Sequence, residues 1–151
     1  MELIKEITLR HYEKSTKKTE RELIRKMCLS IGLLQPEESR DIIIDILYVL
    51  LNAKKQKKKL TIKEIKNKVV ETRKKHRLSS VGISSSNIRR QIYRLRDLLI
   101  IERGVKNAYR ITEFLSLSEI FEEKINGFLI PYLVKGIKKH FKEVDKKFKF
   151  N

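Results

Sequence analysis

The stretch 84–112 constrains the fold more than any other part of the sequence, because a helical pattern passes there directly into a β-hairpin pattern. A run of serines can cap a helix whose apolar side chains recur at i, i+4, i+7 and i+11. These side chains are Ile88, Ile92, Leu95 and Leu99. Two β-prone runs, 99–103 and 108–112, then flank Gly104 and Asn107, which both tolerate a positive φ. No other β pattern is convincing, so the chain is predicted to be mainly α with one small hairpin.

Two helices upstream of this stretch are predicted to complete a three-helix core. Pro36, followed by two acidic residues, opens the first of them, and its wide apolar face over 42–50 should make it the most buried helix. Thr61 and Glu64 have capping-box spacing at the start of the second helix, which should end near Lys75. The lysine-rich run between the two helices predicts an exposed loop, and glycine and serine after the second helix predict a turn.

Residues 1–35 are predicted to form an N-terminal helical arm. Thr19 and Glu22 have capping-box spacing at the start of a helix that Gly32 ends. Residues 2–14 show weaker helical patterning, so the two segments could form one interrupted helix.

Residues 114–151 are predicted to form C-terminal helices. A short helix over 114–124 should be interrupted at Gly127, and Pro131 could open a final helix. Apolar side chains recur along that helix every three or four residues, at Leu133, Ile137, Phe141, Val144 and Phe148. They could cover the core of their own chain. We favour a dimer interface with the same stripe of a second copy, because twofold dimers are the commonest oligomers, and the N-terminal arm is a second candidate for that interface.

The positive charge is concentrated in the middle of the chain. The formal net charge is +17, from 36 Lys and Arg against 19 Asp and Glu. Residues 54–110 hold nineteen basic and four acidic side chains, whereas 1–53 are neutral and 111–151 carry a net +2. A lysine-rich proteome would explain the total net charge, but it should add positive charge to the two ends of the chain as well. The segregation favours a polyanionic partner, because each phosphate that a protein neutralises releases a condensed counterion.

The order helix, helix, turn, helix, hairpin over 37–112 resembles the winged helix-turn-helix family of DNA-binding transcription regulators. The most specific stretch runs from Arg90 to Arg103 and resumes at Ala108-Tyr-Arg-Ile-Thr112. In that family the recognition helix commonly ends in a leucine-rich run that leads into a wing strand, and the return strand often reads Tyr-x-Ile/Leu-Thr. The wing tip here is shorter than the family pattern. The resemblance implies a winged-helix domain over 36–113, a three-helix core plus a short β-hairpin wing, between N- and C-terminal helical extensions.

This resemblance implies a sequence-specific regulator that binds double-stranded DNA as a homodimer, with the recognition helix at about 84–98 in the major groove and the two recognition helices about 34 Å apart. With the apolar stripe facing the core, the N-terminal half of that helix would contact bases and phosphates. The residues expected there are Ser85, Ser86, Arg89, Arg90, Tyr93 and Arg94. Flanking phosphates would be bound by Lys63, Arg73, Lys74, Lys75 and Arg77, and from the wing by Arg103, Lys106 and Arg110. As alternatives, the arginines could pair with Asp97, the serines could serve only as caps, and Tyr93 could be a packing residue.

Residues that could build a catalytic or metal site are scattered. The three histidines are far apart and lack metal-ligand spacing, and the single cysteine, Cys28, lies in an apolar helical stripe. Asp41 and Asp45 are four residues apart, but a solvated helix face is the favoured interpretation of this pair. We therefore expect no enzymatic activity, no cofactor and no metal.

The sequence leaves other functions open. Architectural or replication-associated DNA binding, RNA or ribosome binding, and binding of an acidic protein partner all remain as alternatives. No apolar run approaches the roughly 20 residues that span a bilayer, and the N-terminus lacks a signal-peptide core. We expect a cytoplasmic location, no membrane partner and no small-molecule effector.

Overall fold

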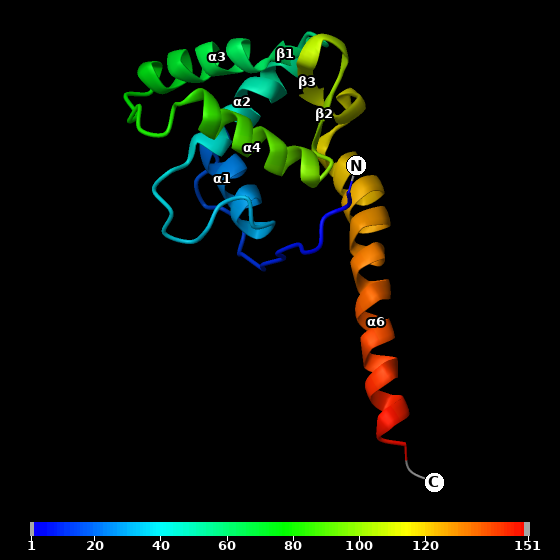
Figure 1. Ribbon diagram of the computed structural model, residues 1–151. Coiled ribbons are helices and arrows are strands. Elements are labelled where there is room, and N and C mark those ends of the chain that lie inside the picture. The colour runs from blue at the N-terminus through cyan, green and yellow to red at the C-terminus, as the bar shows by residue number, and fades with distance from the viewer. Residues whose placement is uncertain (1, 150–151) are drawn as a thin grey trace.

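One long helix projects from the body that the other elements form (Figure 1). The computed structural model describes residues 2–149. Its main elements are α1 (Glu20–Ser30), α2 (Ile42–Lys55), β1 (Leu60–Thr61), α3 (Ile62–Lys75), α4 (Ser85–Asp97), β2 (Ile101–Arg103), β3 (Ala108–Ile111), α5 (Leu117–Ile120), η3 (Phe121–Leu129) and α6 (Ile130–Lys147). Short 3₁₀ turns, η1 (Val105–Asn107) and η2 (Thr112–Phe114), flank β3. The predicted mainly helical fold with a small antiparallel hairpin is confirmed.

Helix α2 lies at the centre of the body. It packs against α1, α3, α4 and β3, and Ile44, Ile46 and Leu47 are fully buried on it. A helix that is apolar nearly all round has to be enclosed by other elements. Each fully buried aliphatic side chain contributes about 1.5–3 kcal/mol, so this helix supplies much of the core. The prediction that it is the most buried helix holds within residues 2–149.

The hairpin belongs to a three-stranded antiparallel sheet with the order β1-β3-β2. In the register, Leu60 of β1 faces Tyr109, and Ile101 of β2 faces Ile111. Strand β1 is not predicted by the sequence, because two residues are too short for an alternating pattern. At the hairpin tip Lys106 and Asn107 adopt positive φ, whereas Gly104 does not.

Two helix starts confirm the sequence signals. The Thr61 hydroxyl accepts from the Glu64 amide at 3.2 Å, and the Glu64 carboxylate accepts from the Thr61 amide at 3.0 Å, which completes the capping box. These hydrogen bonds, with the Thr61 backbone contributing most, lower the pKa of Glu64. Of the three candidate serines, Ser84 caps α4 by accepting from the Asn87 amide at 3.1 Å.

The N-terminal arm departs from the prediction. Helix α1 forms after its Thr19 cap, but residues 2–18 are not helical and form a strap over the body. The strap crosses the end of α1, where the Arg10 amide donates to the Ser30 carbonyl at 2.8 Å. Gly32 makes this crossing possible, because it has a φ of +78° and a Cβ there would lie 2.5 Å from the Thr8 Cβ. Packing on the core outweighs the weak helical pattern.

The start of α2 and the C-terminal helices also differ from the prediction. Helix α2 begins at Ile42 rather than at Pro36, because Glu37 between them adopts a left-handed conformation. Helices α5, η3 and α6 run on without a break over 117–147. Gly127 lies in the π-helical η3, where a Cβ would lie 2.8 Å from the Glu122 carbonyl, and Pro131 lies in the first turn of α6. The wider π turns thus accommodate residues that predict an interruption. Over residues 2–149, no helix combines the length and the apolar content needed to cross a membrane.

Candidate nucleic-acid interface

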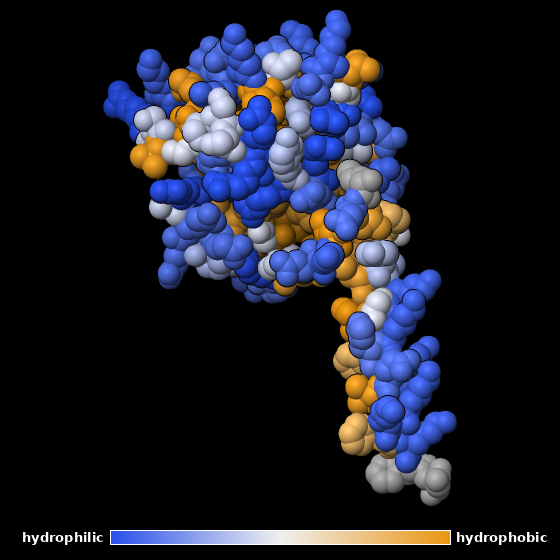
Figure 2. All heavy atoms as spheres, viewed as in Figure 1, coloured by the Kyte–Doolittle hydropathy of each residue, from blue (hydrophilic) through white to orange (hydrophobic). Residues whose placement is uncertain are grey.

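Helix α4 has one buried face and one exposed cationic face. Ile88, Ile92 and Leu95 have no exposed surface and pack into the core. Arg89 and Arg90 lie on the exposed side of the helix. This is the orientation that the apolar spacing predicts. Figure 2 shows that the surface of the body is largely hydrophilic in the view of Figure 1, in which α4 crosses the body.

The N-terminus of α4 combines hydroxyl groups with positive charge. Ser85 and Ser86 are exposed, and the Ser86 hydroxyl lies 3.2 Å from that of Ser84. The Lys66 ammonium on α3 donates to the Ser85 hydroxyl at 3.3 Å. The first turn of α4, all of it described, carries no acidic residue. Free amides, hydroxyls and a lysine at a helix N-terminus favour an anion such as phosphate.

The two exposed arginines are not neutralised within the body. Arg90 donates to the Asn87 side-chain oxygen at 2.7 Å, and the Asn87 side-chain nitrogen donates to the Gly82 carbonyl at 2.7 Å. This chain of contacts ties Arg90 to the turn before the helix. Within residues 2–149 no ion pair joins an arginine of α4 to a carboxylate, so the alternative pairing with Asp97 is not formed.

Tyr93 and Arg94 have other contacts. Tyr93 is 43% exposed, and the Arg96 guanidinium lies 5.7 Å from the centre of its ring. Arg94 is half-buried and donates to the Gln91 side chain at 2.7 Å and to the Gly32 carbonyl at 3.1 Å. Arg94 therefore holds α4 against the end of α1, and its guanidinium is engaged there rather than free for a phosphate.

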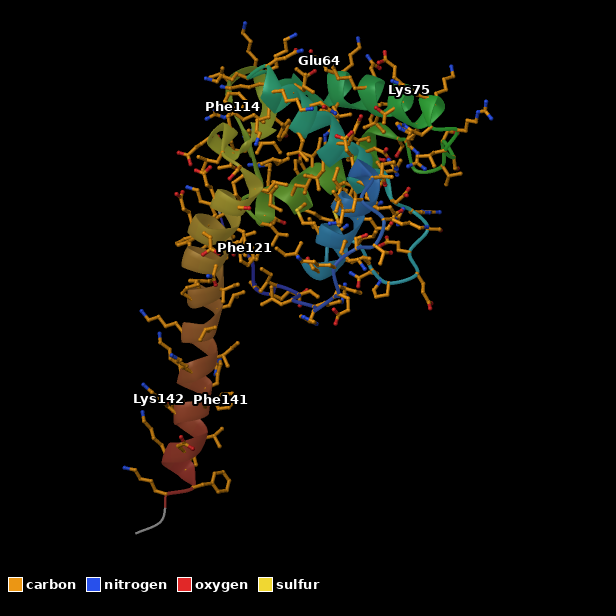
Figure 3. All side chains as sticks on the ribbon, turned by 180° about the vertical axis from the view of Figure 1, so that it is seen from behind. Glu64, Lys75, Phe114, Phe121, Phe141 and Lys142 are labelled. Carbon is orange, nitrogen blue, oxygen red and sulfur yellow. The ribbon has the colours of Figure 1, made fainter. Side chains whose placement is uncertain are left out.

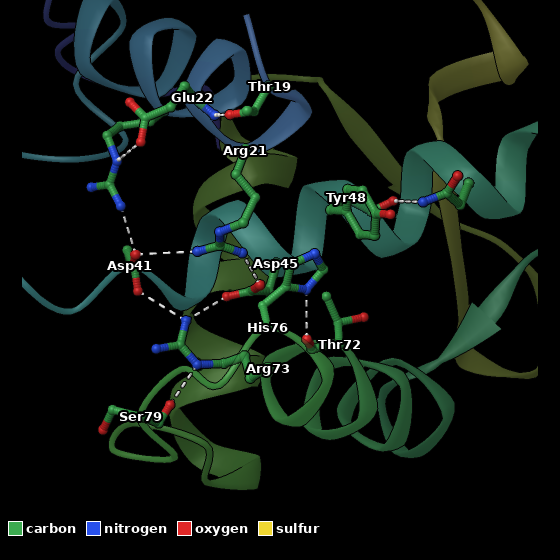
Figure 4. A network of polar contacts seen from close by, with 12 residues as sticks. Thr19, Arg21, Glu22, Asp41, Asp45, Tyr48, Thr72, Arg73, His76 and Ser79 are labelled. Carbon is green, nitrogen blue, oxygen red and sulfur yellow. Dashed lines mark hydrogen bonds and ion pairs between the residues drawn. The ribbon is translucent and has the colours of Figure 1, made fainter. Parts of the chain in front are cut away.

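Arg73 is a correction to the predicted interface. It is only 5% exposed, so it is enclosed by the body and cannot reach a phosphate outside. Its Nη1 donates to Asp41 at 2.9 Å and to Asp45 at 2.6 Å, and its Nε donates to the Ser79 carbonyl at 2.6 Å (Figure 4). The predicted solvated face for the two aspartates is wrong as well, because Asp41 is 7% and Asp45 0% exposed.

The buried charges form a cluster that joins several elements. Arg25 donates to Asp41 at 2.7 Å, and Arg21 contacts both aspartates, so α1, α2 and α3 meet there (Figure 4). Burial disfavours the charged form of Asp41, but its hydrogen bonds from Arg73 and Arg25 outweigh this effect and lower its pKa. Burial likewise opposes the charge of Arg73, and the two aspartates more than compensate and raise its pKa. The cluster is therefore ionised, and through Ser79 it fixes the turn that precedes α4.

Exposed cations extend the candidate interface along α3. Lys63 lies near the start of this helix, and Lys74 and Lys75 lie at its end, with Arg77 just beyond. All four are exposed. Glu64 and Lys75, labelled in Figure 3, mark the two ends of the helix. At 1.5 Å per residue, Lys63 and Lys74 are separated by about 17 Å along the axis. The predicted phosphate-binding set, without Arg73, is thus a row rather than a cluster.

The hairpin contributes a second group of cations. Arg103 and Lys106 are exposed near its tip. Arg110 is not free, because it donates to Glu102 at 2.7 Å and lies 4.7 Å from the centre of the Phe114 ring. The structure also brings the lysine-rich run to the hairpin, since the Lys59 ammonium would lie 3.1 Å from a Cβ at position 104. Sequence reasoning missed this neighbour because it depends on the pairing of the unpredicted β1 with β3.

The predicted dimer residues lie on α6 and away from the body. Ile137 is 54% exposed and Phe141 71%, and none of the side chains of α6, which is described in full, is buried. The alternative in which this stripe covers the core of its own chain is therefore wrong. The stripe is accessible to a partner.

Comparison of the chain with protein-family models, with curated proteins and with solved structures found no match.

Proposed function

We propose that this chain is a winged helix-turn-helix protein that binds double-stranded DNA as a homodimer and regulates transcription. The element order α2-β1-α3-α4-β2-β3 and the sheet order β1-β3-β2 support this fold. The observation that carries the function is α4 itself. Its inner face is locked into the core by Ile88, Ile92 and Leu95, and its outer face presents Arg89 and Arg90 without an opposing carboxylate among the described residues.

In the proposed complex α4 enters the major groove by its N-terminal half. Arg89 and Arg90 contact base edges, where a bidentate arginine–guanine contact contributes about 1–3 kcal/mol of discrimination. Ser85 and Ser86, at the helix start, bind a phosphate. The remaining exposed cations position the protein on the backbone, which adds affinity without sequence information. They are Lys63, Lys74 and Lys75 on α3, Arg77 just beyond it, Arg103 and Lys106 from the hairpin, and Lys57 and Lys58 in the exposed lysine-rich run before β1.

The test is selection of bound duplexes from a random library, followed by binding measurements on variants. We expect Arg89→Ala with Arg90→Ala to lower the affinity ratio between a selected duplex and a random duplex by 10-fold or more, because direct base contacts are lost. Lys57→Ala with Lys58→Ala should weaken both duplexes by a similar factor, since phosphate contacts carry no sequence information.

A matched control separates local contacts from loss of net charge. Lys17→Ala with Lys18→Ala removes the same charge from an exposed part of the strap, before α1. This variant should leave the affinity ratio unchanged. An unchanged ratio in the double-arginine variant would show that α4 does not read DNA. Competition by structured RNA that exceeds competition by duplex DNA would favour an RNA-binding function instead.

A further inference from the structure

An apolar trough runs along the base of the long helix, between that helix and the strap. A cavity of about 440 Å³ is lined by strap, α1 and helix residues, including Leu9, Met27, Phe121 and Ile125. A second cavity of about 820 Å³ follows along the helix and is lined by Ile4, Ile7, Leu9, Ile130, Val134 and Ile137. Leu9 lines both cavities, so they adjoin at this side chain, and we call the two together the trough. Figure 1 shows the strap beginning beside the base of the long helix.

The free end of α6 carries an apolar stripe that continues from this trough. Val134, Ile137, Phe141, Val144 and Phe148 recur at spacings of three and four residues and are between 39% and 75% exposed. Such a spacing is the seam of a helix that pairs with another helix. Figure 2 shows apolar side chains along one edge of α6 and hydrophilic ones along the other. In Figure 3 Phe141 and Lys142 point to opposite sides.

The base of the long helix and its free end carry opposite net charges. The helical wall over 117–130 carries Glu119, Glu122 and Glu123 against Lys124, a net charge of −2. The free end over 135–149 carries seven lysines against two acidic residues, a net charge of +5. Two copies in parallel would place like charges side by side, whereas antiparallel copies place the basic end of each beside the acidic wall of the other. Coulomb attraction therefore favours the antiparallel arrangement.

We propose that the trough is filled by the free end of α6 from a second copy of this chain. In this twofold dimer the two α6 helices are antiparallel, and Phe141 and Phe148 of each copy are inserted between the strap and the helix of the other. The lengths match, because residues 134–148 span about 21 Å and the wall from 121 to 137 about 24 Å. The four inserted phenylalanines bury about 600–1,000 Å² of their own surface, and the trough walls that they cover lose about as much again. The total of about 1,200–2,000 Å² is the range of a stable complex.

This inference specifies the homodimer of the proposed function, but it does not depend on DNA binding. Light scattering coupled to size-exclusion chromatography measures it on the full chain. We expect a dimer for the wild type and a monomer for Phe141→Ser with Phe148→Ser, with the dissociation constant raised at least 100-fold. The matched control, Lys142→Ser with Lys146→Ser on the opposite face, should remain dimeric, because the apolar stripe is intact and residues 135–149 keep a net charge of +3. A monomeric wild type, or a phenylalanine variant that stays dimeric, would overturn the proposal.

Crosslinking tests the direction of the helices. We expect Phe148→Cys alone to form no disulfide between copies, and a mixture of Phe148→Cys chains with Leu9→Cys chains to form a disulfide between the two kinds. Efficient 148–148 disulfides would show a parallel pair and overturn the arrangement. Phe141-dependent binding to anionic phospholipid vesicles by a monomeric wild type would assign the stripe to a membrane surface. Arg89→Ala with Arg90→Ala should remain dimeric, so failure of the dimer and failure of DNA binding are distinguishable.

Discussion

At the scale of the residue, Arg73 is a charged side chain that the body encloses almost completely. Its charge is enclosed between Asp41 and Asp45, and every buried polar side-chain atom among the described residues has a hydrogen-bond partner. In a buried network that is fully hydrogen-bonded, the attraction between the charges compensates for the cost of their desolvation. Removal of one member leaves the other buried charges without this compensation.

We expect Arg73→Ala to lower the free energy of unfolding by about 3–5 kcal/mol, because two buried carboxylates lose their shared partner. Urea unfolding followed by circular dichroism measures this change. The control is Lys74→Ala, one residue along and exposed, which should change stability by no more than about 0.5 kcal/mol. Equal effects of the two substitutions would contradict the structural role of the cluster.

The cluster also predicts how stability depends on pH. The pKa of Asp41 is lowered from its ordinary value of 3.8, so its ionised form stabilises the folded state. This contribution is fully present above the unfolded pKa and is lost as pH falls below about 4 and through the folded pKa. We expect wild-type stability to fall as the pH drops below about 4, and Asp41→Asn to be less stable at pH 6 and to show a smaller fall. An identical acid profile for the two proteins would contradict this prediction.

At the scale of the element, the confirmed predictions are those that depend on residues close together in the sequence. The capping box at Thr61 and the apolar spacing of α4 depend only on residues within one or two turns, and both are confirmed. The hairpin is confirmed for the same reason.

The elements that were missed depend on distant partners. Strand β1 forms because it pairs with β3. The strap is extended because it packs across the end of α1, where the Arg10 amide donates to the Ser30 carbonyl. The buried role of Asp45 shows the same limit for the site. A carboxylate inside an apolar run signals a buried partner, but the sequence does not say that the partner is Arg73, 28 residues away.

Gly32 tests the crossing of the strap over α1. We expect Gly32→Ala to lower the free energy of unfolding by more than about 1 kcal/mol, because its φ is positive and a Cβ would meet Thr8. Gly136→Ala is the contrasting control, since nothing lies within 4 Å of a Cβ there and the position is helical. It should stabilise the protein by about 0.5–1 kcal/mol. Thermal unfolding compares the two, and a neutral Gly32→Ala would contradict the crossing.

At the scale of the whole molecule, the basic surface and the exposed apolar stripe lie on different parts of the chain. The body holds the strongly basic segment 54–110, with a net charge of +15, and the rod formed by α6 carries the exposed apolar stripe. In the proposed function the body binds DNA and the rod joins two bodies. Affinity for DNA should therefore fall steeply with salt, while the dimer should persist because apolar contacts are not screened.

The most direct test of the DNA-binding proposal is the affinity of the full chain for a library-selected duplex relative to a random duplex, measured at about 0.15 M salt. Sequence-specific recognition by α4 predicts a selected site with at least about 10³-fold tighter binding. Equal affinity for both duplexes, or no binding to either, would contradict recognition of DNA by Arg89 and Arg90.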